Sequence, residues 1–262
     1  DPATTEIYTL SLHDALPISE KDGGVSESVG STLFKMGNSY HYMGDHENAV
    51  NFCLQALAVY TEIHGSNSIH PKIAKILNNL GTFYEDLKRF DDAETYHFKA
   101  LAVYQQIPGA DEDVARVLKN IAYCFMISNQ SLKALEYYHK ALKLYPTLED
   151  TPHNREEHVI VIKLLGSTYS NMERYDEAEQ YYRKAIDAAQ SQNPELYQLI
   201  IDIYMLMKQM YEKTGCVVMA EECYRNATRA HEEEIFAQNP QAFLNMWLSS
   251  FTVTSTTGSN SD

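Results

Sequence analysis

The chain has no long hydrophobic run, and its sequence therefore predicts no membrane-spanning helix. No window approaches the roughly 18 consecutive apolar residues that a membrane span needs. Basic residues are also in deficit, because 21 Lys and Arg face 36 Asp and Glu and leave a formal net charge of −15. Such a charge disfavours nonspecific attraction to nucleic acid phosphates and to anionic lipid. We expect no nucleic acid partner and no membrane insertion.

Cysteine is scarce, with four residues in a chain of 262. They stand in apolar, helix-like segments, and their spacing matches no zinc-ligand pattern. The four are Cys53, Cys124, Cys216 and Cys223. We expect them to be buried and reduced, since unpaired cysteine behaves as a small apolar residue. Reduced cysteine is typical of a reducing compartment, so we predict a cytoplasmic protein.

Signs of catalytic chemistry are missing as well. The eleven glycines form no phosphate-binding loop. The segment HNREEH at 153–158 is not the zinc motif His-Glu-x-x-His, and we interpret it as a solvated polar connection. The segment ADED at 110–113 is expected to supply an acidic helix start. We predict no enzyme, no catalytic residue, no metal and no cofactor.

What the sequence does contain is a repeat. In five places a tyrosine or phenylalanine precedes an alanine by nine residues, and a second alanine follows the first by seven. Successive copies are 44, 41, 44 and 42 residues apart, and periods of about 20–50 residues indicate stacked repeat proteins. The aromatic residues are Tyr40, Tyr84, Phe125, Tyr169 and Tyr211. The alanines are Ala49, Ala56, Ala93, Ala100, Ala134, Ala141, Ala178, Ala185, Ala220 and Ala227.

Each copy predicts two helices joined by a short polar turn. Apolar residues recur at helical spacing in both halves, and Pro71 stands where a helix begins without losing a hydrogen bond. Small residues of the first helix are expected to face the alanines of the second, so that the two backbones approach closely. These small residues are Gly37, Gly81, Ala122 and Gly166. The aromatic side chains then fill the remaining core.

The segments from Leu80-Gly81 to Tyr84 and from Leu165-Gly166 to Tyr169 resemble the tetratricopeptide repeat. The family period is about 34 residues. The longer spacing here, with HPKIAKILNNLG opening the second copy, is similar to the repeats of kinesin light chains. This resemblance implies an all-α fold, with antiparallel helix pairs stacked as a right-handed superhelical solenoid. The copies depart from the family pattern by lacking its tryptophan, by Ala122 in the third and by Lys208 in the fifth.

The repeat pattern sets the expected domain organisation. Five helix pairs are predicted within residues 25–236, at 28–62, 71–105, 113–146, 156–190 and 195–236. A capping helix is expected at 237–251, followed by a disordered polar tail at 252–262.

Residues 1–24 are expected to be a non-native or disordered leader. Within them, residues 3–18 resemble the in-frame translation of an adapter used in sequencing libraries. A targeting peptide is disfavoured, because this stretch has no Lys or Arg and contains Glu6 and Asp14. We therefore expect native sequence upstream of the chain to be missing.

In tetratricopeptide proteins the first helices of successive repeats line a concave groove that holds peptides, and the resemblance implies such a groove here. Counted from the Leu-Gly pair, one stripe of each first helix points away from the packed face. The residues predicted to line the groove are Asn38, Lys75, Asn78, Asn79, Thr82, Arg116, Lys119, Asn120, Tyr123, Lys163 and Ser167. Asn78 and Asn79 match the paired asparagines of the kinesin light chain groove and inherit that role by resemblance.

The charges of this stripe suggest a class of partner. Its middle carries Lys75, Arg116, Lys119 and Lys163 against the single acid Glu85. Lysine and arginine pair with carboxylates, and asparagine binds peptide backbone. We predict a noncatalytic scaffold or adaptor that binds a short acidic peptide, with Tyr123 and Met126 supplying a pocket for an aromatic or aliphatic anchor.

Other interpretations stay open. The stripe is also consistent with ordinary solvated helix faces. The array is consistent with the regulatory part of a larger protein, an enzyme or signalling NTPase whose N-terminal part is missing. A structural repeat protein that self-associates is a further alternative, and the sequence does not determine the oligomeric state.

Overall fold

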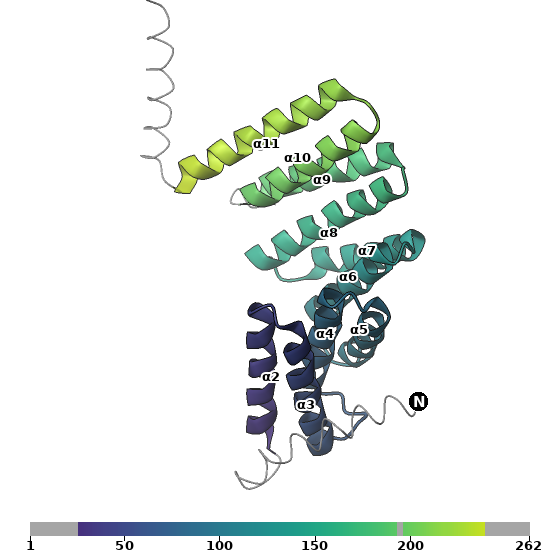
Figure 1. The fold of residues 1–262 in the computed structure, drawn as a ribbon, viewed down its shortest axis with the longest axis vertical. Helices are drawn as coiled ribbons and strands as arrows, with labels where there is room; N and C mark the ends of the chain where they lie inside the picture. The colour runs from purple at the N-terminus through teal and green to yellow at the C-terminus, as the bar shows by residue number, and fades with distance from the viewer. Residues whose placement is uncertain (1–25, 193–195, 239–262) are drawn as a thin grey trace, which may run out of the picture. The chain divides into compact units, whose positions relative to one another are not determined.

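The computed structural model describes residues 26–192 and 196–238, and every regular element in these ranges is helical. The chain divides after Leu148 into two compact units, which are described separately. The predicted all-α fold of antiparallel helix pairs is confirmed (Figure 1). In the described part of the chain, no helix is long and apolar enough to cross a membrane.

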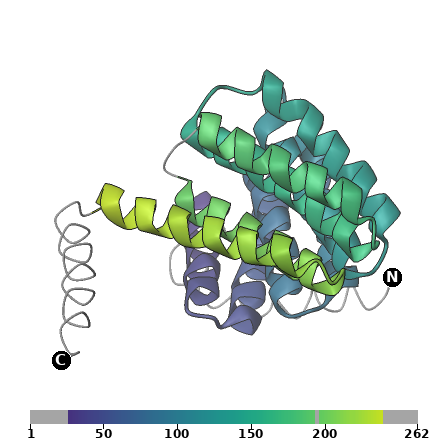
Figure 2. The same cartoon turned by 90° about the horizontal axis from the view of Figure 1, so that it is seen from above.

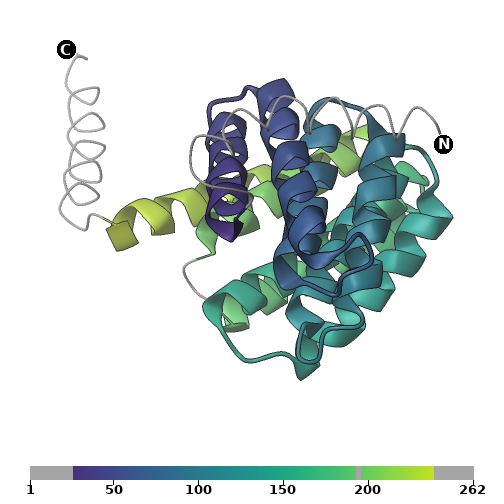
Figure 3. The same ribbon diagram turned by 90° about the horizontal axis from the view of Figure 1, so that it is seen from below.

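The described residues of unit 1 form three helix pairs. They are α2 (Glu27–Tyr42) with α3 (His46–His64), α4 (Pro71–Asp86) with α5 (Phe90–Tyr104), and α6 (Asp111–Ile127) with α7 (Ser131–Leu144). A short 3-10 helix, η1 (Tyr145–Thr147), follows α7. The two helices of the first pair run side by side in every view (Figure 1, Figure 2, Figure 3).

Unit 2 contains two helix pairs in its described residues. They are α8 (Pro152–Asn171) with α9 (Tyr175–Gln192), and α10 (Tyr197–Lys213) with α11 (Val217–Gln238). The expected leader at 1–24 and tail at 252–262 lie outside the described residues, as does the expected capping helix beyond its first two positions.

The same three-residue turn joins the two helices of every pair. Its middle residue has a positive φ, between 58° and 79°. The amide that follows donates to the carbonyl of the repeat's aromatic residue over 2.8–3.0 Å, which satisfies a carbonyl at the end of the first helix. The middle residues are Gly44, Lys88, Asn129, Glu173 and Gly215.

The alanines of the repeat are buried, and the two helices of each pair pack against each other. Gly37 lies against Ala49, as we expected, but Gly81 and Gly166 face aromatic rings instead of the alanines. A Cβ on Gly81 would lie 2.4 Å from the His97 ring, and one on Gly166 would lie 2.8 Å from the Tyr182 ring. These rings stand one helical turn after the alanine. Gly81 and Gly166 therefore make room for a ring, whereas a Cβ on Gly37 would meet the Cys53 sulfur at 2.6 Å and the Ala49 carbonyl oxygen at 3.0 Å.

The structure also tests three expectations about the cysteines and about two short segments. Cys53, Cys124 and Cys223 are buried and free, but Cys216 is exposed, so its predicted burial was wrong. Residues 153–158 lie in the first turns of α8 rather than in a connection, because Pro152 begins the helix and Thr151 caps it. The acidic start at 111–113 is confirmed as the first turn of α6.

Candidate functional site

The first helices of the three repeats in unit 1 are joined by asparagine side chains. Asn79 Nδ2 on α4 donates to Asn38 Oδ1 on α2 over 2.9 Å. Asn120 Nδ2 on α6 donates to Asn78 Oδ1 on α4 over 3.2 Å. These bonds bring predicted residues of three helices together, on what we call the first-helix face. Its members are Asn38, Lys75, Asn78, Asn79, Thr82, Arg116, Lys119, Asn120 and Tyr123.

Asn78 differs from the expectation, because its side chain is buried rather than pointing outward. Its Oδ1 lies 3.0 Å from Nδ1 of His97, and the His97 ring is fully buried. The opposite ring nitrogen, Nε2, lies 3.0 Å from Glu85 Oε1. The ring fits against α4 because Gly81 has no side chain at that point. Both ring nitrogens of His97 therefore meet an oxygen of α4.

Cys124 completes this buried polar chain. Its thiol lies 3.2 Å from Glu85 Oε1 and donates to it. Burial raises the pKa of the Cys124 thiol above its ordinary range, and the Glu85 carboxylate raises it further. The thiol therefore stays protonated at neutral pH. Because a cysteine nucleophile must be a thiolate, Cys124 acts here as a hydrogen-bond donor that links α6 to α4.

The charged members of the face differ in their surroundings. Lys75 is exposed, and Lys119 is partly exposed. Arg116 forms an ion pair with Asp113 one turn earlier on α6, so its positive charge is partly compensated within the helix. The face is thus less basic than the sequence alone indicated.

The uncharged members Thr82 and Tyr123 are both partly exposed, whereas Met126, expected beside Tyr123 in the anchor pocket, is buried in the core. The Thr82 hydroxyl donates to the Asn78 carbonyl of its own helix over 3.4 Å. Burial raises the pKa of Tyr123, so its hydroxyl remains protonated at neutral pH and is able to donate.

Lys163 and Ser167, the remaining predicted groove residues, lie on α8 of unit 2. Burial lowers the pKa of the Lys163 ammonium, and Asp202 on α10 opposes that shift. The Ser167 hydroxyl accepts from Tyr182 over 3.2 Å and donates to the Lys163 carbonyl over 3.3 Å. Ser167 therefore supports the packing of Tyr182 on α9.

Sequence reasoning missed the joint role of Glu85, His97 and Cys124. The sequence predicted only that Cys124 is buried, and it gave no separate role to Glu85 or His97. One signal was available, since the same repeat position carries Cys53, Tyr138 and Tyr182 in other copies, and a histidine in such a buried place needs polar partners.

Comparison with known proteins supports the repeat assignment. Models of the tetratricopeptide repeat match residues 30–71, 72–147 and 164–192, which together make up more than half of the chain. The regulatory protein RapK of Bacillus subtilis (strain 168) is 25% identical over 121 residues, covering 45% of this chain and 32% of that protein. The chain thus spans about a third of the length of this curated relative.

Solved structures share the fold. BtubC (BKLC) from P. vanneervenii has a TM-score of 0.63 and 21% identity, covering 86% of this chain and 88% of that one. A putative kinesin light chain from Podosopora anserina with nearly identical TPR-like repeats has a TM-score of 0.64 and 14% identity, covering 79% and 97%. At these identities the likeness concerns the fold alone. With its five repeat turns and the family matches, the chain belongs to the tetratricopeptide repeat proteins.

Proposed function

We propose that this chain is a noncatalytic scaffold or adaptor whose first-helix face binds a short, extended acidic peptide. Tetratricopeptide repeats support a role in protein interaction, and proteins of this family and fold are typically noncatalytic. The observation that carries the peptide proposal is the pair of asparagine bridges across α2, α4 and α6.

The bridges leave part of each carboxamide for a ligand. The Nδ2 group of Asn38 and the Oδ1 atoms of Asn79 and Asn120 form no hydrogen bond with another described residue, so they can pair with a ligand. All three side chains are partly exposed. An amide donor and two carbonyl acceptors are the groups that pair with the N–H and C=O of an extended backbone. The bridges also hold the carboxamides in place, which lowers the entropy lost on binding.

The charge preference rests on the bases beside the asparagines. Lys75 and Lys119 stand on α4 and α6, and Arg116 stands one turn before Asn120. The nearby acid Glu85 is engaged by His97 and Cys124. Arg116 already pairs with Asp113, so the exposed Lys75 is the base whose positive charge a ligand carboxylate would meet most directly. Tyr123 supplies an apolar ring surface for an anchoring side chain.

The test is fluorescence anisotropy with labelled acidic, neutral and basic peptides of equal length, each carrying one aromatic residue. We expect selective binding of the acidic peptide that weakens as salt rises, because exposed charge pairs are screened. Lys119→Glu should weaken binding about fivefold or more, equivalent to roughly 1 kcal/mol for one exposed pair. Asn79→Ala should weaken all peptides alike, since it removes a backbone contact.

The matched control is Lys143→Glu, which makes the same charge change at an exposed position of α7, the second helix of its pair. It should leave every affinity unchanged. Equal binding of the three peptides, or equal loss in Lys119→Glu and Lys143→Glu, would rule out the charge preference. Absence of binding to any peptide by the folded chain would rule out the face itself.

A second candidate follows from RapK, a regulatory protein of which this chain matches about a third. In that case the array would be the regulatory part of a longer protein. Sequencing the complete transcript tests this candidate, which requires an additional domain beside the repeats.

A further inference from the structure

Two histidines and an aspartate from three helices meet at one end of the first two repeats of unit 1. His41 lies in the last turn of α2, His46 is the first residue of α3, and Asp86 is the last residue of α4. The positive φ of Gly44 reverses the chain between the two histidines. We call these three residues the His–Asp cluster.

The distances within the His–Asp cluster suit a tetrahedral cation. His41 Nδ1 lies 3.2 Å from Asp86 Oδ2, and His46 Nδ1 lies 3.4 Å from the same oxygen. The three ligand atoms all lie within 4.8 Å of one another. Zinc bonds of about 2.0–2.1 Å at tetrahedral angles place neighbouring ligand atoms about 3.3–3.4 Å apart. The two distances from the histidine nitrogens to Asp86 Oδ2 therefore already match those between zinc ligands.

Hydrogen bonding does not account for this arrangement. Both Nδ1 atoms are buried and have no hydrogen-bond partner among the described residues, although each is within ion-pair distance of Asp86. Each nitrogen is thus close to the carboxylate, but the angle does not suit a hydrogen bond from an N–H group. Buried imidazole nitrogens without a partner are costly, and a cation between them and the carboxylate removes that cost. The two rings cross at 60°, so they approach a shared point from different directions.

The surroundings favour positive charge. Asp86 and His41 stand at helix C-termini, where the backbone carbonyls attract cations. His46 stands at a helix N-terminus, but Asp45 caps that end and adds a carboxylate beside it. Among the described residues, the ion pairs of Asp86 are those with the two histidines.

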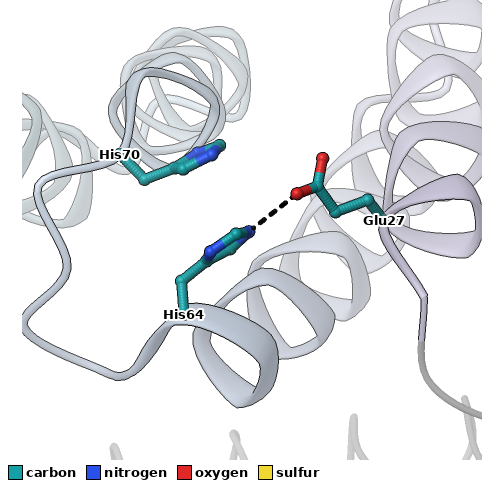
Figure 4. Close-up of side chains that lie close together, drawn as sticks. All are labelled: Glu27, His64 and His70. Carbon is teal, nitrogen blue, oxygen red and sulfur yellow. Dashed lines mark ion pairs between the residues drawn. The ribbon is translucent and has the colours of Figure 1, made fainter.

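A second group, Glu27, His64 and His70, is a weaker candidate (Figure 4). In Figure 4 a dashed line joins His64 to Glu27, and the His70 ring lies over the His64 ring. The rings stack at 4.2 Å with 21° between their planes, so their nitrogen lone pairs run nearly parallel. Lys72 also pairs with Glu27 and would repel a cation.

We propose that His41, His46 and Asp86 bind one Zn²⁺ ion, with the fourth position open to water. Imidazole and carboxylate are ordinary zinc ligands, and three protein ligands with one open position are a known zinc arrangement. The side chains are 29%, 29% and 36% exposed, which leaves a path for the ion. The bound ion joins α2 and α3 of the first repeat to α4 of the second.

The test is isothermal titration calorimetry of Zn²⁺ into the full chain after treatment with a chelator. We expect one equivalent to bind to the unsubstituted chain. Replacing a residue that only hydrogen-bonds to a metal ligand typically costs roughly 10–100-fold in metal affinity. His41→Ala and Asp86→Asn remove a ligand itself, so each should raise the Kd for Zn²⁺ by more than that. Circular dichroism establishes that each variant is folded. The Asp86→Asn substitution replaces the carboxylate by a side chain of nearly the same size and shape, so it disturbs the packing least.

Two controls separate this site from other zinc ligands in the chain. The double variant His64→Ala/His70→Ala removes the second group, and Cys216→Ser removes the exposed thiol. Both should keep the wild-type Kd. Zinc should also raise the melting temperature of the unsubstituted chain but not that of Asp86→Asn, since a ligand of the native state stabilises it. Unchanged zinc affinity in His41→Ala and Asp86→Asn, or no zinc binding by the unsubstituted chain, would overturn the proposal.

Discussion

Single residues in this array are constrained by neighbours that stand far away in the sequence. The ring of His97 occupies the space that the missing side chain of Gly81 leaves, and it bonds to Asn78 and Glu85 from there. In the fourth repeat the ring of Tyr182 takes the corresponding place beside Gly166. The same glycine position therefore supports a polar network in one repeat and apolar packing in another.

Gly81→Ala should destabilise the protein more than Gly166→Ala. The added Cβ would lie 2.4 Å from the His97 ring, and moving that ring disturbs its polar contacts with Asn78 and Glu85 as well as the packing. We expect a loss of about 2–4 kcal/mol in the free energy of unfolding, measured by urea denaturation. The Gly166→Ala variant displaces a ring with one hydroxyl contact and should cost about 1–3 kcal/mol. Equal losses would show that the polar network contributes nothing specific.

At the scale of the element, the helix pair depends on its turn. The middle residue of each turn adopts the left-handed conformation, which only glycine occupies without strain. Two turns have Gly44 and Gly215 there, but others have Lys88, Asn129 and Glu173. The chain tolerates these residues because the bond to the aromatic carbonyl and the packing of both helices determine the reversal.

Lys88→Gly and Glu173→Gly should therefore stabilise the protein. Each removes the strain of a side chain at positive φ, and we expect a gain of up to about 1 kcal/mol in the free energy of unfolding. Gly44→Ala is the reverse control, because a Cβ at Gly44 meets nothing within 4 Å and only the backbone conformation opposes it. It should cost about 1 kcal/mol. A loss of stability in both glycine variants, measured by thermal denaturation, would contradict this account.

At the scale of the whole molecule, stability is distributed over repeats that contact their neighbours. In such arrays the free energy is approximately a sum of repeat and interface contributions, so damage is felt most strongly nearby. The helix pairs of unit 1 and unit 2 each bury their own alanines and aromatic rings. A substitution in one unit is therefore expected to spare much of the other.

Ala178→Arg tests this expectation in unit 2. Ala178 is fully buried, and an arginine there would bring an unpaired charge and a long side chain between α8 and α9. We expect a cost above about 4 kcal/mol, with loss of hydrogen-exchange protection in the helices of unit 2 and retained protection in α4 and α5. Uniform loss of protection across both units would instead indicate a single cooperative unit.

The sequence by itself determined the repeated part of this protein. The spacing of aromatic residues and alanines predicted the helix pairs, and Pro71 and the acidic residues at 111–113 predicted helix starts that the structure confirms. These features are recoverable because helix periodicity and capping act over a few residues. The sequence also indicated which residues of the first helices to consider as a groove, since these were counted from the Leu-Gly pair of each repeat.

Only the tertiary structure decided which polar groups meet. Asn78 turned out to be buried because His97, 19 residues away, needs its oxygen. Glu85 and Cys124 are 39 residues apart and still touch. The His–Asp cluster joins His41 to Asp86 across two repeats. The first contact depends on how the two helices of one pair pack against each other, and the other two depend on how one helix pair is rotated against the next. Both follow from side-chain packing between helices rather than from any local pattern.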